Sequence, residues 1–271
     1  IRGLSRIGDR VAPDQVAPDA GGGGAELRIT GVVESAAPDG LAISTQVIDR
    51  RSGQVLLSGR YPVNPGRDGK DTLDAAASVA ANVHCALEDR GRTRLSPEAM
   101  SLLLNACAAV FDEGAEGRML GVTRRLVKAA PGFGKGHAMH AIGAALSAQQ
   151  TPPGSPERAA LTRETETAAR TALRLDPRAA KAYSALALLE GALDNSLRKD
   201  WFAIERHTTQ ALAIDPDLPP AHNEYALMLR QVGRLQDALT YHRALSGSSD
   251  PRNGPGDPRA AMLLAATGDL D

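Results

Sequence analysis

Ala172-Leu173-Arg174-Leu175-Asp176-Pro177 is the first copy of a phrase that returns as Ala211-Leu212-Ala213-Ile214-Asp215-Pro216. A weaker copy, Leu126–Pro131, precedes both. Each phrase is typical of the last turn of a helix, which the closing proline prevents from continuing. Helix ends that recur in this way predict a stack of similar helical hairpins. Such stacks usually bind other proteins rather than catalyse reactions.

Counting back from the closing prolines divides the region into repeats of about 34 residues. The repeat from Met100 to Phe133 fits without an insertion, and the repeat that begins at Pro219 fits best. In that last repeat Gly233 stands where a tight turn joins two helices, and glycine tolerates the backbone conformation of such a turn. We therefore expect about four helical hairpins.

Two of the repeats carry extra residues, and one is cut short. The repeats from Gly134 and Ala180 have insertions before their second helices, and we place them at Gln149–Arg158 and near Asp194–Trp201. A polar, glycine-rich loop is expected at 246–256, followed by a first helix from about Asp257 whose partner helix is absent.

The residues before the repeats predict a small module of strands and one helix. Apolar and polar residues alternate in Leu27–Glu34, Leu41–Ile48 and Val55–Tyr61, as in half-buried strands joined by tight turns. A helix follows from about Asp71 to Asp89, with an apolar stripe that we expect to cover the sheet. The stripe consists of Leu73, Ala76, Ala80, Val83 and Leu87. Residues 1–24, rich in glycine and proline, are expected to be a flexible segment.

The composition sets limits on function. The chain of 271 residues has a formal net charge of −1, so no overall field favours nucleic acid or anionic lipid. No apolar run is long enough to span a membrane. Its two cysteines, Cys85 and Cys107, fall in different predicted helices, and we expect each to be a buried free thiol. The chain begins with Ile1 and ends within a repeat, so we expect a fragment of a longer protein, with any targeting signal outside it.

Residues 97–271 resemble the tetratricopeptide repeat (TPR) family, in the spacing of the closing prolines and of the small residues Ala226 and Ala238. Residues 26–61, through the phrases Glu26–Val33, Ile43–Asp49 and Ser52–Leu56, resemble the TolB-N-terminal-like (FlgO-like) domain. The resemblance implies a place between a bacterial output module, such as a CadC-type winged helix or an adenylate cyclase, and a TPR array. The helix expected before the first strand is replaced by residues 9–24, which have no apolar stripe.

Together these features predict a mainly α protein. We expect an α-α superhelix of TPR helical hairpins (residues 96–271), preceded by a small α+β module (residues 25–92) made of a three-stranded antiparallel sheet plus a helix.

Several motifs that suggest chemistry fit structural roles better. Pro131–Gly136 resembles a phosphate-binding loop, but it follows a helix and lacks the leading glycine and the final hydroxyl, so we interpret it as a turn between repeats. His137 and His140 are three residues apart, yet no third metal ligand stands near them, and we expect them to pack between helices. Trp201, in the second insertion, either anchors a partner or covers the core. We predict no enzyme, no cofactor, no metal and no bound nucleic acid.

The predicted function is protein interaction. In TPR proteins the concave groove is lined by fixed places on each first helix, and here those places carry three cations among amides and aliphatic side chains. Such a groove suits a peptide or protein with acidic groups. The alternative is a solvated groove that binds nothing tightly, or one closed by another domain. The predicted contact residues are Asn105, Lys135, Lys181, Asn223, Leu227 and Arg230, with Phe111, Ile142 and Leu188 beside them.

The biological setting has two interpretations. The first is a sensor region of a larger bacterial signalling or transcription-regulatory protein, cytoplasmic or periplasmic. The alternative is a free-standing scaffold in envelope or secretion assembly. The sequence predicts neither the partner nor the oligomeric state.

Overall fold

The structure is a computed structural model that describes residues 27–36, 40–63, 70–88, 93–110, 116–191 and 199–246. The chain divides into two compact units, with the boundary between Ala108 and Ala109. The expected flexible segment 1–24, most of the polar loop 246–256 and the shortened repeat from Asp257 lie outside the described residues, as does most of the insertion near Asp194–Trp201.

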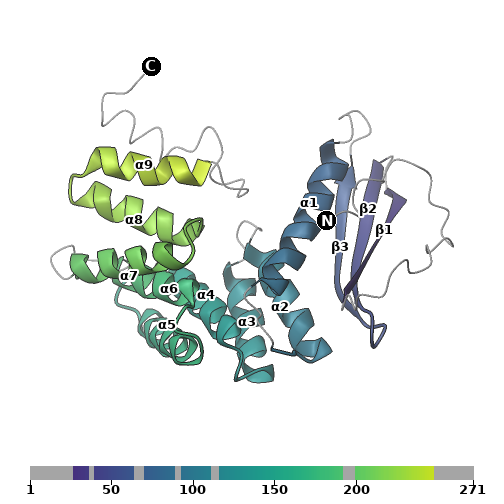
Figure 1. Ribbon diagram of the computed structural model, residues 1–271, viewed down its shortest axis with the longest axis horizontal. Helices are drawn as coiled ribbons and strands as arrows, with labels where there is room; N and C mark the ends of the chain where they lie inside the picture. The colour runs from purple at the N-terminus through teal and green to yellow at the C-terminus, as the bar shows by residue number, and fades with distance from the viewer. Residues whose placement is uncertain are drawn as a thin grey trace, which may run out of the picture. The chain divides into compact units, whose positions relative to one another are not determined.

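The N-terminal unit begins with the predicted meander. Strands β1 (Leu27–Ala36), β2 (Gly40–Asp49) and β3 (Val55–Val63) form an antiparallel sheet in the order β1-β2-β3 (Figure 1). The turn between β2 and β3 is held by Asp49, whose carboxylate accepts hydrogen bonds from the backbone N–H and the hydroxyl of Ser52. Gly53 completes the turn with a φ of 72°, which glycine adopts without a Cβ clash.

Helix α1 (Lys70–Leu87) packs against β3 and β2, as the sequence predicts. The described part of α1 does not bury the predicted stripe, because Leu87 is exposed and the most deeply buried residues are Val79, Asn82 and Ala86. Leu73 and Ala76 of that stripe lie outside the residues whose burial is described. The buried positions are thus offset by one residue from the predicted ones and include a polar side chain, which sequence periodicity assigns to the outside.

The expectation of two free thiols is wrong. Cys85 on α1 and Cys107 on α2 (Pro97–Val110) form a disulfide, with their Cα atoms 5.9 Å apart. The hydroxyl of Ser101, also on α2, donates a hydrogen bond to the backbone oxygen of Leu56 in β3. Helix α2 therefore belongs to the N-terminal unit, whereas the sequence places the start of the helical array at residue 96.

The second unit is a stack of helical hairpins. Helices α4, α6 and α8 each pair with the helix that follows, and α4 contacts α6, which contacts α8 (Figure 1). The second helix of one hairpin also packs against the first helix of the next, so the hairpins form one continuous array and the predicted fold class is confirmed. The helices are α3 (Glu116–Ala129), α4 (Gly134–Gln150), α5 (Pro156–Leu175), α6 (Ala180–Gly191), α7 (Trp201–Ile214), α8 (Pro219–Gln231) and α9 (Leu235–Ser246).

The same hydrogen bond closes each of the three joints between repeats. The Nε2 atom of His137 lies 2.8 Å from the backbone oxygen of Pro131, and that of His222 lies 2.6 Å from the backbone oxygen of Pro216. At the middle joint the hydroxyl of Tyr183 donates to the oxygen of Pro177 at 3.4 Å. In every joint a ring at the fourth place of a repeat holds the carbonyl of the proline six residues before it. Within Pro131–Gly136, residues 131–133 accordingly form the predicted turn between helices, and Gly134–Gly136 begin α4.

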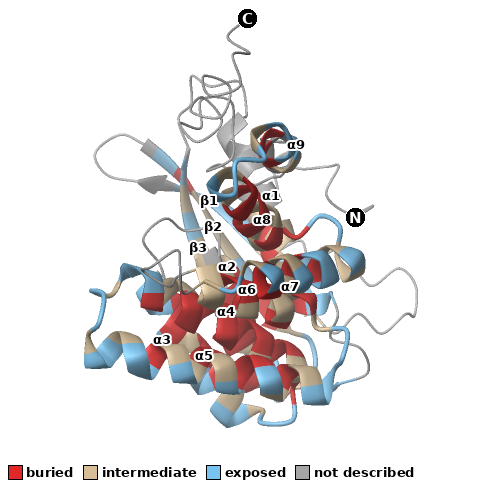
Figure 2. Cartoon of the chain, turned by 90° about the vertical axis from the view of Figure 1, so that its left-hand side faces the viewer, coloured by how far each residue is buried: buried red, intermediate tan, exposed pale blue. Residues whose placement is uncertain are grey.

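Small residues fill the centre of the array. Ala141, Ala144, Ala169, Ala172 and Ala211 have no exposed surface, and the buried positions lie mainly where helices face each other (Figure 2). Alanine favours the helix and lets neighbouring axes approach closely. None of the described helices is long and apolar enough to cross a membrane.

Candidate functional site

The candidate site is the surface formed by the first helices of the three hairpins, α4, α6 and α8. We call it the first-helix face. These helices lie side by side because each contacts the next, which brings residues far apart in sequence onto one surface. The predicted contact residues on this face are Lys135, Ile142, Lys181, Leu188, Asn223, Leu227 and Arg230.

The first-helix face is closed toward α4 and more open toward α8. Lys135 is 8% exposed, and Ile142 and Leu188 are buried as well. Lys181, Asn223, Leu227 and Arg230 are each only partly buried. A partner that meets this face would therefore reach Lys181 on α6 and the predicted contact residues of α8 first.

Two other predicted residues are not among the described residues of α4, α6 and α8. Asn105 is exposed on α2, in the N-terminal unit, where its side-chain amide donates to the backbone oxygen of Ser101 at 2.8 Å. Phe111 lies outside the described residues. Their part in binding stays a prediction.

A buried carboxylate on the same face was missed by the sequence reasoning. Glu224, on α8, is 4% exposed, and burial raises its pKa to about 7, while the nearby charge of Lys199 acts in the opposite direction. The hydroxyl of Ser184, on α6, is also buried and has no hydrogen-bond partner among the described residues. The place of Glu224 beside the predicted contact residue Asn223 could have singled it out, but its burial comes from the neighbouring helix α6.

A second acidic side chain lies at the end of α6. Burial raises the pKa of Glu190, and the negative charge of Asp200 adds to the effect. The helices of the first-helix face thus carry two carboxylates whose ionisation is disfavoured by their surroundings. With a pKa of about 7, Glu224 is only partly ionised at neutral pH and adds less negative charge to the face than a fully ionised carboxylate would.

One cluster in the described residues resembles a catalytic triad in its contacts. Nδ1 of His140 lies 3.1 Å from Oγ1 of Thr123, and its Nε2 lies 3.0 Å from a carboxylate oxygen of Glu164. Arg124 holds both oxygens of Glu164 at 2.7 Å, and these hydrogen bonds lower the pKa of that carboxyl. Burial lowers the pKa of His140, and its Nε2 faces the carboxylate of Glu164 as the donor.

This cluster joins helices rather than presenting a nucleophile. Thr123 has no exposed surface, and its hydroxyl also lies within 2.8 Å of the backbone oxygen of Met119. The imidazole of His140 is buried between α3, α4 and α5. A substrate has no access to the hydroxyl in this arrangement, so we interpret the cluster as a polar link between α3 and the α4–α5 hairpin.

The remaining candidates fall into structural roles. No group of three or more His, Cys, Asp or Glu side chains is placed to hold a metal in the part of the chain that the structure describes. Trp201 begins α7 and packs against the core cluster around Ile204 and Leu229, whereas its neighbour Phe202 is 81% exposed. The exposed aromatic residue at this position is therefore Phe202.

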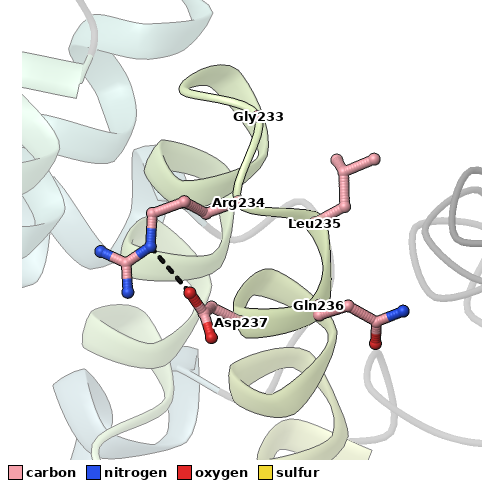
Figure 3. A pocket seen from close by; sticks show the side chains of 5 residues that line it. All are labelled: Gly233, Arg234, Leu235, Gln236 and Asp237. Carbon is pink, nitrogen blue, oxygen red and sulfur yellow. Dashed lines mark hydrogen bonds and ion pairs between the residues drawn. The ribbon is translucent and has the colours of Figure 1, made fainter.

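A shallow depression of about 350 Å³ lies at the turn between α8 and α9 (Figure 3). It is lined by five consecutive residues, Gly233 to Asp237, and Nε of Arg234 donates to the carboxylate of Asp237 at 2.7 Å. Because its cation is already paired with an acid one helical turn away, we assign no ligand to it.

Comparison with known proteins assigns no family to this chain. The sequence matches no model of a known protein family and no curated protein. Among solved structures, the chain is similar to a thermophilic TPR protein of Thermus thermophilus, with 21% sequence identity and a TM-score of 0.49. The similarity covers 74% of this chain and 98% of that one, and it carries no argument about function.

Proposed function

We propose that this chain is a non-catalytic protein-interaction region that binds a protein or peptide partner along the first-helix face. The observation that carries the proposal is the side-by-side packing of α4, α6 and α8, which forms one continuous surface from three repeats. Arrays of this kind present extended binding surfaces because each repeat adds the same face to its neighbour.

The partner that fits best is a segment with acidic groups. Lys181 and Arg230 are both only partly buried, so both side chains keep surface that a partner can contact. Leu227 and Asn223 supply an apolar and an amide contact beside them. The raised pKa of Glu224 supports this choice, because it reduces the negative charge on the face at neutral pH.

Two settings fit such a region. The resemblance of the N-terminal residues to the TolB-N-terminal-like domain favours a sensor part of a bacterial signalling or transcription-regulatory protein. The Cys85–Cys107 disulfide favours the alternative, a scaffold of the envelope or of secretion assembly, because disulfides persist in oxidising compartments.

Selection of peptides from a random library on the intact chain tests the proposal. We expect the selected peptides to be enriched in Asp and Glu. The double variant K181E/R230E should bind them about tenfold or more weakly, since two charge contacts become repulsive. Lys135 is tested separately as Lys135→Met, because a carboxylate at a buried position destabilises the fold itself.

The matched control is R163E/R174E, which reverses two exposed charges on α5, a second helix. Circular dichroism should show the same helix content in all variants. Peptides without acidic residues, or equal loss of binding in the control, would overturn the assignment of the first-helix face.

A further inference from the structure

Strand β1 is a sheet edge with little of the usual protection against pairing. It is the outermost strand of the sheet, and none of the described residues pairs with its outer side (Figure 1). Its ten residues pair with β2 in one unbroken register and include neither proline nor lysine. Natural proteins usually blunt such an edge with a bulge, a proline or a lysine, because unpaired backbone groups attract another strand.

The opposite edge strand, β3, has features that protect it against pairing with another strand. Strand β3 carries Pro62, which has no N–H to donate, and its register with β2 is interrupted by an irregularity at Val47 and Ile48. Strand β1 is therefore better suited than β3 to pair with another strand.

The side chains of β1 leave apolar surface open. Ile29 is 42% exposed, Val32 is 59% exposed and Val33 is 60% exposed. Ile29 and Val33 share the face of the sheet that carries Ile43 and Val47, because their register partners in β2 are Val47 and Ile43. The apolar face of the sheet therefore extends to β1, where Ile29 and Val33 are exposed.

The sequence of β1 is complementary to itself when two copies run antiparallel about Gly31. In that register Arg28 of one copy stands opposite Glu34 of the other, and Ile29 stands opposite Val33. Each pair occurs twice, once on each side of the twofold axis, as an isologous interface requires. Thr30 opposite Val32 completes the set with two β-branched residues.

We propose that two copies of this chain pair through β1, antiparallel and centred on Gly31, to form one six-stranded sheet. The paired strands place four apolar side chains, Ile29 and Val33 of each copy, on one face. Glu34 already accepts hydrogen bonds from Ser44 and Arg60, both at Oε1, which leaves Oε2 for the arginine of the second copy. This inference is independent of the first-helix face and of any partner bound there.

Charge reversal tests the register. In the R28E variant every Arg28–Glu34 pair becomes a pair of carboxylates, and in E34R every such pair becomes two cations. Each variant alone should self-associate about tenfold or more weakly than the native chain in sedimentation equilibrium. An equimolar mixture should recover the dimer. When one copy of each variant pairs, both pairs place a carboxylate opposite a guanidinium group, so the attraction is restored.

Hydrophobic substitution supplies a matched comparison. Ile29→Lys should abolish the dimer, whereas Leu41→Lys should leave it intact. The two side chains are similar in size and similarly exposed, at 42% and 38%, but Leu41 lies on the central strand.

A crosslink tests the axis in a way that does not depend on charge. A Cβ at Gly31 would meet only ordinary contacts with Ser44 and Thr45, so Gly31→Cys fits the native strand. Two cysteines on the axis lie about 5 Å apart between Cα atoms and should form a disulfide between copies under mild oxidation. Val33→Cys is the control, because its symmetry mate lies four positions along the strand, about 13 Å away.

The results of these experiments distinguish a second β1 strand from any other segment that could cover the edge of β1. Recovery in the mixture together with the Gly31→Cys crosslink supports the pair of β1 strands. A native chain that stays monomeric across micromolar concentrations, as expected if residues before Leu27 cover the edge, overturns the proposal. So does a dimer that forms without the crosslink or that ignores the charge variants.

Discussion

The carboxylate of Glu224 on α8 lies directly against Gly191, the last residue of α6, so closely that a methyl group added to Gly191 would overlap its Oε1 atom. The two first helices therefore approach at a point where one supplies a buried acid and the other supplies no side chain. This contact explains why a glycine ends α6 and why the acid loses its contact with water.

Replacing Gly191 with alanine should destabilise the array by about 1–3 kcal/mol, since the added methyl group forces Glu224 or a helix to move. Glu224→Ala in the same chain should remove most of that cost, and urea unfolding of the four chains gives the coupling energy. Gly121→Ala is the control, because its Cβ would meet nothing within 4 Å on α3, and there alanine should stabilise the helix. Additive effects of the two substitutions would contradict the contact.

The pH dependence of stability should carry the signature of Glu224. Its pKa is about 7 in the folded chain against 4.5 as the ordinary value, so the unfolded chain ionises first. The free energy of unfolding should therefore fall as the pH rises from about 4.5 to about 7. Glu224→Gln should remove this fall and raise the stability at pH 8 by about 1–3 kcal/mol.

Thermal unfolding of both chains at several pH values measures the difference. Glu164 provides the opposite sign within the same array, because Arg124 lowers its pKa and its stabilisation is lost as the pH falls. Identical pH profiles for the native chain and Glu224→Gln would show that Glu224 is ionised in the folded state across the range.

Reduction of the Cys85–Cys107 disulfide should destabilise the N-terminal unit by about 3 kcal/mol, since it releases a loop closed over 22 residues. Both cysteines belong to that unit, so the unfolding of the helical array serves as the internal control. Hydrogen exchange with and without reductant reports the two units separately. Equal protection of α1 and α2 in both conditions would show that the other contacts of the unit suffice.

The turn between α8 and α9 should require its glycine. Gly233 has a φ of 83°, and its own N–H and that of Arg234 bond back to α8, to the carbonyls of Arg230 and Leu229. Gly233→Ala should cost about 1–2 kcal/mol, because a Cβ disfavours this backbone conformation. Gly132→Ala is the comparison, since a Cβ there meets nothing within 4 Å and Gly132 is not among the glycines with positive φ. Its melting temperature should change little.

The local parts of this fold were predictable because they depend on neighbouring residues. Alternation of apolar residues predicted all three strands, and the closing prolines at 131, 177 and 216 predicted where helices end. Gly233 was predicted in a tight turn because glycine tolerates unusual backbone angles, and its φ of 83° confirms this prediction. Each of these signals is contained within a few residues of the chain.

The features that were missed depend on contacts between distant residues. The pairing of Cys85 with Cys107 requires α1 and α2 to lie together, and no spacing rule supplies that for two cysteines. The burial of Asn82 and of Glu224 likewise follows from neighbouring elements rather than from the pattern of their own helix. The burial of Lys135, a predicted contact residue, has the same origin, and its role in binding stays a prediction.

The ring-to-proline bonds at His137, Tyr183 and His222 have a consequence for how such a chain grows. Each bond connects residues six positions apart, so both of its partners lie in one short segment of sequence. Residues from other repeats supply neither partner. A duplication or deletion that spans one proline-to-proline interval therefore carries a complete joint with it. The array can therefore gain or lose whole hairpins while each junction between repeats keeps its ring-to-proline hydrogen bond.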